Sequence, residues 1–156
     1  MLDELLGSEY KTEFLYLKND KLKYNHFNHS LSGYYHFHNS NYLLTPDKIM
    51  NVEDANFIMI QAMYVLIAQY YLHEKGIRFS DFKEKILQNI MISKVTWEFK
   101  EYIFKNKHKD SFNIQLVSTK TDSKNRPWFN CTFQLSDSKF LASFNACIFP
   151  ENLHKI

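Results

Sequence analysis

The sequence predicts an α+β fold in which one antiparallel sheet wraps around a single long central helix. The first observation behind this prediction is the segment 52–76, which reads as one helix that is apolar on nearly every face. A helix of that kind must be buried on all sides. The second observation is that strand-like segments precede this helix and fill the half of the chain that follows it. A sheet curled around the helix would bury it.

A lipid bilayer is the other environment that could bury such a helix. A spanning helix needs about 20 predominantly apolar residues, whereas this segment contains Asn56, Gln61 and Gln69 and has charged residues at both ends. We therefore expect a protein interior and no integral membrane segment. One sheet wrapped around one helix is the hotdog fold, and we expect residues 1–156 to form a single hotdog domain.

The segments before the central helix alternate between strand-like runs and turn signals. A short helical turn is expected over residues 3–7, Gly33 is expected to precede a strand, and residues 39–48 are expected to form a loop. Asn51 is placed to cap the central helix, and Gly76 is placed to end it. The expected strands in this half of the chain are residues 10–17, 21–26 and 34–38.

After the central helix we expect a short helix over residues 80–88, with Ser80 as its N-cap, and then four strands. The alternation of apolar and polar residues in these strands is typical of an antiparallel sheet with one face on a core. The expected strands are residues 89–99, 112–120, 126–135 and 140–149. The expected inward-facing residues of the last two are Phe129, Cys131, Phe133, Leu135, Phe140, Ala142, Phe144, Ala146 and Ile148.

The composition excludes several classes of function. Only three glycines are present, and neither a dinucleotide-binding nor a P-loop motif occurs, so we expect no cofactor. A net charge of +2 does not indicate a nucleic-acid partner. The acidic N-terminus lacks an apolar leader segment, and Cys131 and Cys147 form no CxxC motif, so we expect a cytoplasmic protein with reduced, buried cysteines.

Two clusters of residues leave alternatives open. Four histidines (His26, His29, His36 and His38) fall close together, and the spacing of the last two occurs in zinc sites, but no further metal ligand is evident. We expect no metal, and for the histidines either surface or packing roles or contact with the substrate. The densest basic cluster is expected to be a solvated loop, or else a contact for coenzyme A phosphates or an acidic carrier protein: Lys105, Lys107, His108 and Lys109.

The start of the central helix is the most promising place for chemistry. Glu53 and Asp54 lie at the positive end of the helix dipole, where a carboxylate could be a base or could simply complement the dipole. Gln61 lies mid-helix among apolar residues, so it either makes a structural hydrogen bond or donates to a substrate carbonyl. Tyr10, Tyr42 and Tyr64 could add hydroxyl donors to this site.

The chain resembles the FcoT-like hotdog family, typified by a mycobacterial long-chain fatty acyl-CoA thioesterase. The resemblance is nearly collinear from about residue 4 to residue 150. The matching stretches are GYYHFHNSNYLLTPDKIMNVEDANFIMIQAMY, NIMISKVTWEFKEYIFKNKHKDSFNIQL and FNCTFQLSDSKFLASFNACIFP. The family has an Asn-Gln pair in the helix, where this chain has Ile60-Gln61 followed by Tyr64. It also has a His-Phe-Asn-x-x-Glu stretch, where this chain has Ile49 for His, retains Asn51 and has Asp54 for Glu.

The resemblance implies action on an acyl thioester, carried by coenzyme A or by an acyl carrier protein. Thioester hydrolysis is the leading expectation. The alternatives are a lyase that adds glycine or water to a 2-enoyl thioester, as in isonitrile lipopeptide pathways, and a non-catalytic acyl-binding subunit. The expected catalytic residues are Tyr10, Tyr42, Asp54 and Gln61, and the expected substrate contacts are His36, His38, Asn51, Ile60 and Tyr64. A homodimer, or a larger assembly such as a hexamer, is expected because hotdog sheets usually pair edge to edge.

Overall fold

The computed structural model describes residues 2–7, 16–18, 21–37, 49–105 and 110–149. Helix α1 (Leu2–Leu6) and the strands β1 (Lys23–Asn25) and β2 (Ser30–Tyr35) come before the central helix α2 (Val52–Glu74). Helix α3 (Phe79–Lys85) and a 3₁₀ turn (Leu87–Asn89) follow it. The rest of the described chain forms the strands β3 (Ile90–Phe99), β4 (Asp110–Thr121), β5 (Pro127–Leu135) and β6 (Phe140–Ile148).

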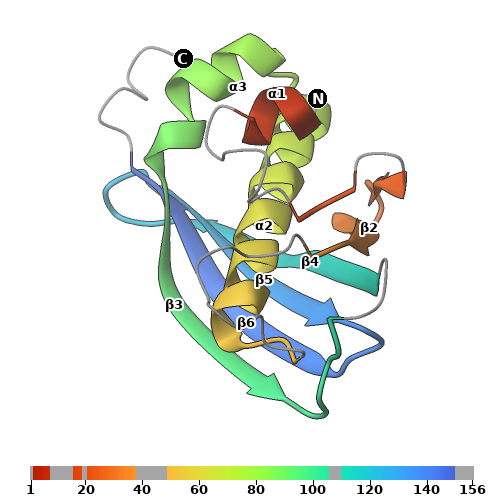
Figure 1. Cartoon of the computed structure of the whole chain (residues 1–156). Helices are drawn as coiled ribbons and strands as arrows, with labels where there is room; N and C mark the ends of the chain where they lie inside the picture. Colours follow the sequence, from red (N-terminus) through yellow and green to blue (C-terminus); the bar gives the residue numbers. More distant parts are fainter. Residues whose placement is uncertain (1, 8–15, 19–20, 38–48, 106–109, 150–156) are drawn as a thin grey trace.

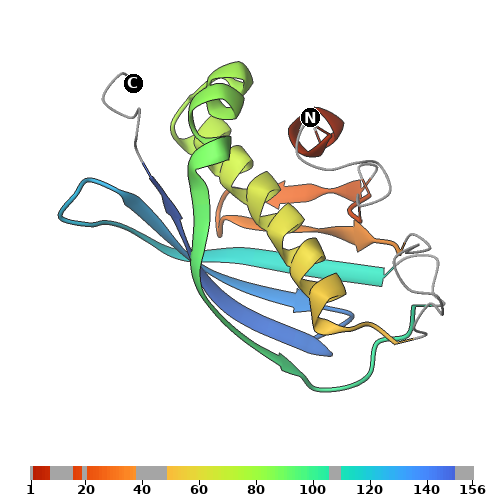
Figure 2. The same ribbon diagram turned by 60° about the vertical axis from the view of Figure 1, so that its left-hand side comes forward.

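The strands form one antiparallel sheet in the order β1-β2-β4-β5-β6-β3. Helix α2 lies across one face of this sheet, and the sheet curves around it (Figure 1, Figure 2). Although β3 follows α2 and α3 in the chain, it pairs with β6 at the edge of the sheet opposite β1. This arrangement confirms the predicted α+β fold with one wrapped sheet.

The core lies between α2 and the concave face of the sheet. Buried and more exposed residues alternate along β5 and most of β6, so every second side chain points toward α2. All of the inward-facing residues expected in these two strands are buried. Helix α2 is long and apolar enough to cross a membrane by length and composition alone, yet most of it is buried inside the protein. The expectation of a protein interior for this helix is therefore confirmed.

The two ends of α2 are fixed by the residues that the sequence suggests. The Asn51 side chain accepts a hydrogen bond from the Asp54 backbone N–H at 2.9 Å, and Asp54 Oδ2 accepts one from the Asn51 N–H at 3.2 Å. This reciprocal capping box satisfies two N–H groups that the helix itself leaves without partners. At the other end, Gly76 adopts φ = +63°, a left-handed conformation that glycine reaches without steric cost.

We expect Asn51→Ala to lower the free energy of unfolding by about 1 kcal/mol, because the side-chain acceptor of the cap is lost. Urea denaturation at a fixed protein concentration measures this difference. Asn51→Ser is the matched control, because serine keeps an oxygen that can cap the helix, and it should lie close to the wild type. Equal stability of the alanine variant and the wild type would contradict a stabilising role for the cap.

Three local predictions are wrong. Helix α3 begins at Phe79 with Arg78 as its N-cap rather than Ser80, because Phe79 packs on the core and Arg78 Nε donates to Asp81 Oδ2 at 2.9 Å across the first turn. Gly33 lies inside β2, where a Cβ atom would come within 2.8 Å of Leu22 Cδ2. β1 covers only three residues of the strand expected over residues 21–26.

Candidate functional site

The site is built where the chain enters α2. Asp54 is 1% exposed, and its Oδ2 atom lies 2.6 Å from Lys105 Nζ. Lys105 comes from the segment between β3 and β4. Two contacts bring this segment to the helix entrance: Met50 N donates to Ile103 O at 2.8 Å, and residue 49 forms an isolated bridge with residue 104. The fold thus places Lys105 beside Asp54, although the two residues lie far apart in the sequence.

Lys105 is therefore not part of a solvated loop, and this expectation is wrong. Its side chain is 12% exposed, and Nζ also lies 5.5 Å from the centroid of the Phe37 ring. A buried carboxylate needs a partner to offset its loss of hydration, and the ammonium group supplies one. The other residues of the expected basic cluster, 107–109, lie outside the described part of the chain. Sequence reasoning did not place Lys105 beside Asp54.

Gln61 lies about two helical turns beyond Asp54 and is fully buried. Its Oε1 atom accepts a hydrogen bond from the Tyr16 backbone N–H at 3.0 Å. Tyr16 O in turn accepts from His36 N at 2.9 Å, and the Tyr16 ring stacks on Phe57 with centroids 6.2 Å apart. Gln61 therefore makes the structural hydrogen bond that was one of its two expected roles. An interaction with substrate would have to use its amide Nε2 group.

Asn56 is a polar residue of this region that sequence reasoning did not nominate. Its Oδ1 atom is buried and has no hydrogen-bond partner among the described residues. A buried amide oxygen without a partner costs roughly 1–3 kcal/mol, so such an atom calls for an explanation. Asn56 precedes Ile60 by four residues, so both share one face of α2. A signal in the sequence is its helical spacing from Ile60, the position where the family that the chain resembles has an asparagine.

The remaining expected site residues fall into three groups. Tyr10, His38 and Tyr42 lie outside the described residues. Ile60 and Tyr64 are partly buried on α2 and pack against the core. Asn51 caps the helix beside Asp54, and His36 lies in the chain directly before Phe37, whose ring faces Lys105. The structure therefore places Asn51 beside Asp54 and Lys105 in contact with Asp54.

A hollow of about 620 Å³ is formed by the segment that delivers Lys105. Phe104 and Tyr102 are 51% and 73% exposed, which is high for aromatic side chains. An apolar surface beside charged side chains can receive a ligand that has both apolar and anionic parts. The residues that line the hollow are Phe99, Lys100, Glu101, Tyr102, Phe104 and Lys139.

Two of the clustered histidines lie at the opposite end of α2, on the hairpin of β1 and β2. His26 packs against His73 with ring centroids 5.6 Å apart, and Tyr24 Oη lies 3.2 Å from His29 Nδ1. Burial, followed by the charge of Glu74, raises the pKa of Tyr24 to about 12, so this hydroxyl stays protonated at neutral pH. Among the described residues, no group of three or more His, Cys, Asp or Glu side chains is arranged to hold a metal ion.

Both cysteines are free and buried, which confirms the packing role expected for them. Burial raises the pKa of the Cys131 thiol to about 12. Because the thiolate is the nucleophilic form of cysteine, a thiol with so high a pKa is a poor nucleophile at neutral pH. The pKa of Cys147 is also raised by burial.

No protein-family model and no curated protein matches the chain. Solved structures do match it. YhdA of Lactococcus lactis, assigned as a thioesterase, superposes with a TM-score of 0.52 at 8% identity, and the match covers 97% of this chain and 98% of YhdA. Cj0977 of Campylobacter jejuni, a sigma28-regulated virulence protein, gives 0.51 at 9% identity, with 98% and 99% covered. An HP0420 homologue of Helicobacter felis gives 0.48 at 14% identity, with 96% and 90% covered.

At these identities the likeness concerns the fold. Together with the observed sheet order and the central helix, it shows that the chain has the hotdog fold. The matches to YhdA and Cj0977 extend over nearly the whole chain, so they include the start of α2 and the strand β3.

Proposed function

We propose that this protein acts on acyl thioesters, with hydrolysis as its reaction. The observation that carries the proposal is the buried Asp54–Lys105 pair at the start of α2, which places a carboxylate and an ammonium group 2.6 Å apart. A buried acid–base pair beside a hollow is a candidate for proton transfer. The resemblance to FcoT-like thioesterases supplies the substrate class.

In hydrolysis, the oxygen of a water molecule attacks the thioester carbonyl carbon and the C–S bond breaks. Asp54 would accept a proton from the water and pass it to the departing thiolate, so the products are a free acid and a thiol. Lys105 would compensate the charge of the carboxylate before and after this transfer.

The remaining residues are assigned to binding the substrate. The Gln61 Nε2 group and the hydroxyl of Tyr42 would polarise the thioester carbonyl, and Tyr10 would orient the thioester. Further substrate contacts are assigned to Asn51, Ile60, Tyr64, His36 and His38. The acyl chain would lie along α2, and the carrier, either coenzyme A or an acyl carrier protein, would enter past the hollow that contains Phe104.

We further propose that two copies pair through β3, as hotdog sheets usually do. β3 is an edge strand of ten residues, and its exposed side chains include Met91, Val95 and Trp97, which are 48%, 37% and 46% exposed. A long edge with apolar side chains is a template for pairing with another strand. Light scattering at micromolar concentration tests this pairing, because a monomeric protein would contradict it.

Thiol release from a panel of acyl-CoAs and acyl carrier proteins tests the proposed reaction, with mass spectrometry of the acyl products. The panel spans short and long chains, saturated and 2-enoyl, with and without glycine. We expect a free acid together with one thiol for each acyl group consumed. Binding without turnover across the whole panel would replace the proposal with a non-catalytic acyl-binding role.

The same ion pair favours a second reaction, addition of glycine or water across a 2-enoyl thioester. This chemistry needs a base to deprotonate the nucleophile and an acid to protonate the α-carbon. Asp54 and Lys105 would supply the two groups from one site. The product would be a β-substituted acyl thioester that keeps its C–S bond. Adduct formation without thiol release therefore distinguishes the lyase from the thioesterase.

A further inference from the structure

The turn between β5 and β6, residues 136–139, has a strained backbone. Ser136, Asp137 and Ser138 have φ values of +52°, +55° and +70°, so three successive residues that are not glycine adopt the left-handed conformation. This conformation is sterically unfavourable for a residue with a Cβ atom, and residues that adopt it usually do so singly. Such strain persists only where the surrounding structure enforces it, and it is most common at functional sites.

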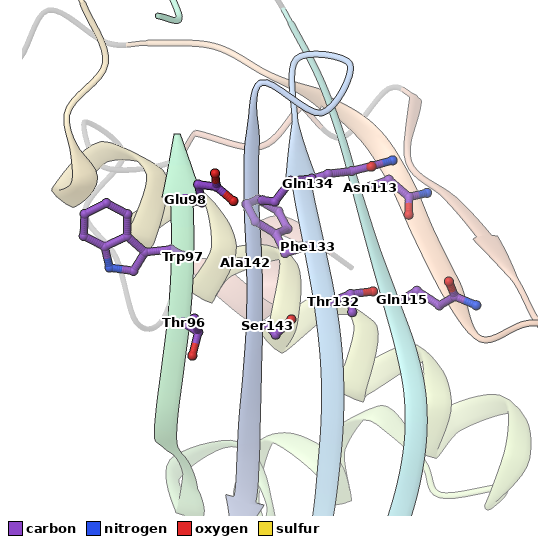
Figure 3. Close-up of a pocket in the computed structure, with 11 residues that line it drawn as sticks. Thr96, Trp97, Glu98, Asn113, Gln115, Thr132, Phe133, Gln134, Ala142 and Ser143 are labelled. Carbon is purple, nitrogen blue, oxygen red and sulfur yellow. The ribbon is translucent and has the colours of Figure 1, made fainter. Parts of the chain in front are cut away.

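The β5–β6 turn lies at the end of the sheet where α2 begins (Figure 2). Figure 3 views the same end from the convex face, away from α2, over a hollow of about 590 Å³. Glu98 of β3 and Gln134 of β5 lie there on either side of β6, in register with Leu141. Because β3 and β5 each end one residue further on, the segment that carries Lys105 begins next to the turn.

The first residue of the turn joins a chain of hydrogen bonds. Ser136 is 2% exposed, and its Oγ atom donates to Asp110 Oδ2 at 2.6 Å. Tyr35 Oη lies 2.6 Å from the same Oγ atom. Because a serine hydroxyl has one proton, which here goes to the carboxylate, the tyrosine hydroxyl donates the second bond. Burial raises the pKa of Tyr35, so its hydroxyl keeps that proton at neutral pH.

Ring contacts connect this chain of hydrogen bonds to Lys105. The Tyr35 ring meets the Phe37 ring edge to face, with centroids 5.6 Å apart. Lys105 Nζ lies 5.5 Å from the centroid of Phe37 and 2.6 Å from Asp54 Oδ2. Tyr35 is fully buried, and a close-packed interior transmits a shift from one side chain to the next. The hydroxyl of Ser136 therefore restrains the ammonium group of Lys105 through two aromatic rings.

The last residue of the turn holds the same segment through its backbone. Lys139 O accepts hydrogen bonds from the N–H groups of Lys100 and Glu101, directly after β3, at 2.7 and 3.3 Å. Lys139 N donates to Leu135 O at 3.0 Å, which closes the left-handed turn. Both ends of the turn thus contact the residues that connect β3 to β4.

We propose that Ser136 and Tyr35 are positioning residues that hold Lys105 beside the Asp54 carboxylate. This role rests on the proposed function, because the proposed reaction uses the Asp54–Lys105 pair. Both residues act through Phe37 rather than by touching the substrate. A group that compensates charge during a reaction must stay in place, since a displacement of about 1 Å can cost about 10²-fold in rate. The strained turn supplies this restraint by placing the Ser136 hydroxyl between Tyr35 and the carboxylate at the start of β4.

Ser136→Gly tests this role by the rate at which an acetylating reagent modifies Lys105, measured by mass spectrometry. Glycine removes the hydroxyl but adopts the left-handed conformation freely, so the turn can keep its shape. We expect Lys105 to be modified about 2- to 10-fold faster than in the wild type, the change that one lost hydrogen bond makes to a local opening equilibrium. Asp137→Gly is the matched control, because it relieves the same strain and keeps Ser136. Its Lys105 should be modified at the wild-type rate.

Lys85 is the internal reference that reveals a fault in folding. Its Nζ atom lies 3.2 Å from Asp81 Oδ1 on α3, at the opposite end of α2 (Figure 1), so its rate of modification should not change. If Ser136→Gly also accelerates Lys85, Tyr35→Phe decides, because it keeps the serine and the ring and loses only the tyrosine hydroxyl. A wild-type rate at Lys105 in the folded variant, or an equal acceleration in Asp137→Gly, overturns the proposal.

Turnover of acyl thioesters provides an independent readout. Where the wild type is active, we expect Ser136→Gly to lower kcat about tenfold with little change in KM, because displacement of Lys105 affects the reaction rather than binding. Asp137→Gly should keep the wild-type kcat, and an unchanged kcat in Ser136→Gly overturns the positioning role. A wild type that turns over no acyl thioester defeats the proposed function instead. The modification rates then still decide whether Ser136 positions Lys105.

Discussion

Replacing Lys105 with methionine is expected to lower the free energy of unfolding by about 3–5 kcal/mol. Methionine fills a similar length of apolar space but leaves the Asp54 carboxylate, which is 1% exposed, without its ammonium partner. A buried charge that loses its partner costs far more than the intact pair contributes. Thermal and urea unfolding at a fixed protein concentration measure the loss.

The double variant Asp54→Asn/Lys105→Met provides the control for this prediction. It removes both charges and keeps an amide that can still accept from the Asn51 N–H, so we expect it to recover most of the stability. Exchange of a buried pair for neutral groups of similar size is often close to neutral in free energy. A single Lys105 variant that is as stable as the wild type would contradict the stabilising role assigned to the ion pair.

The same two variants separate stability from catalysis. We expect the double variant to be folded yet to lose turnover by about 10²–10⁴-fold, the usual contribution of a positioned acid or base. An edge-paired, stable and fully active double variant would remove Asp54 from the proposed mechanism. The hotdog fold would not be affected, because it rests on the sheet and on α2.

The fold could be predicted because its main elements repeat a short-range pattern. The all-round apolar run that becomes α2 requires burial on every side, and the alternation along β5 and β6 determines which side chains face it. The caps at Asn51 and Gly76 were also local signals. Such patterns are contained within a few residues, so the sequence carries them without knowledge of the folded chain.

The candidate site could be predicted only in part, because its partners come from distant segments. Asp54 was recognisable from its place at the helix start, but its contact with Lys105 depends on how the segment after β3 returns to α2. Likewise, the bond from Tyr16 N to Gln61 Oε1 joins residues 45 positions apart. No periodicity or motif encodes these pairs. They arise from the topology that places β3 at the sheet edge and α2 across its face.

The alternation along β5 also predicts a large effect of a single change in the core. Phe133 is 2% exposed and lies among the aromatic rings of β4 and β6, with centroids 6.5 Å from Phe112 and 6.3 Å from Phe140. Phe133→Ala removes buried surface and leaves a cavity, so we expect a loss of about 3–5 kcal/mol. For a chain of this length, that loss corresponds to a fall of roughly 6–20 °C in Tm.

The neighbouring residue supplies the control within the same strand. Thr132 points to the opposite face of the sheet and is exposed, so Thr132→Ala should change the free energy of unfolding by less than about 0.5 kcal/mol. Similar losses from the two alanine variants would mean that β5 does not separate a core face from a convex face. The fold depends on that separation, because α2 covers only one face of the sheet.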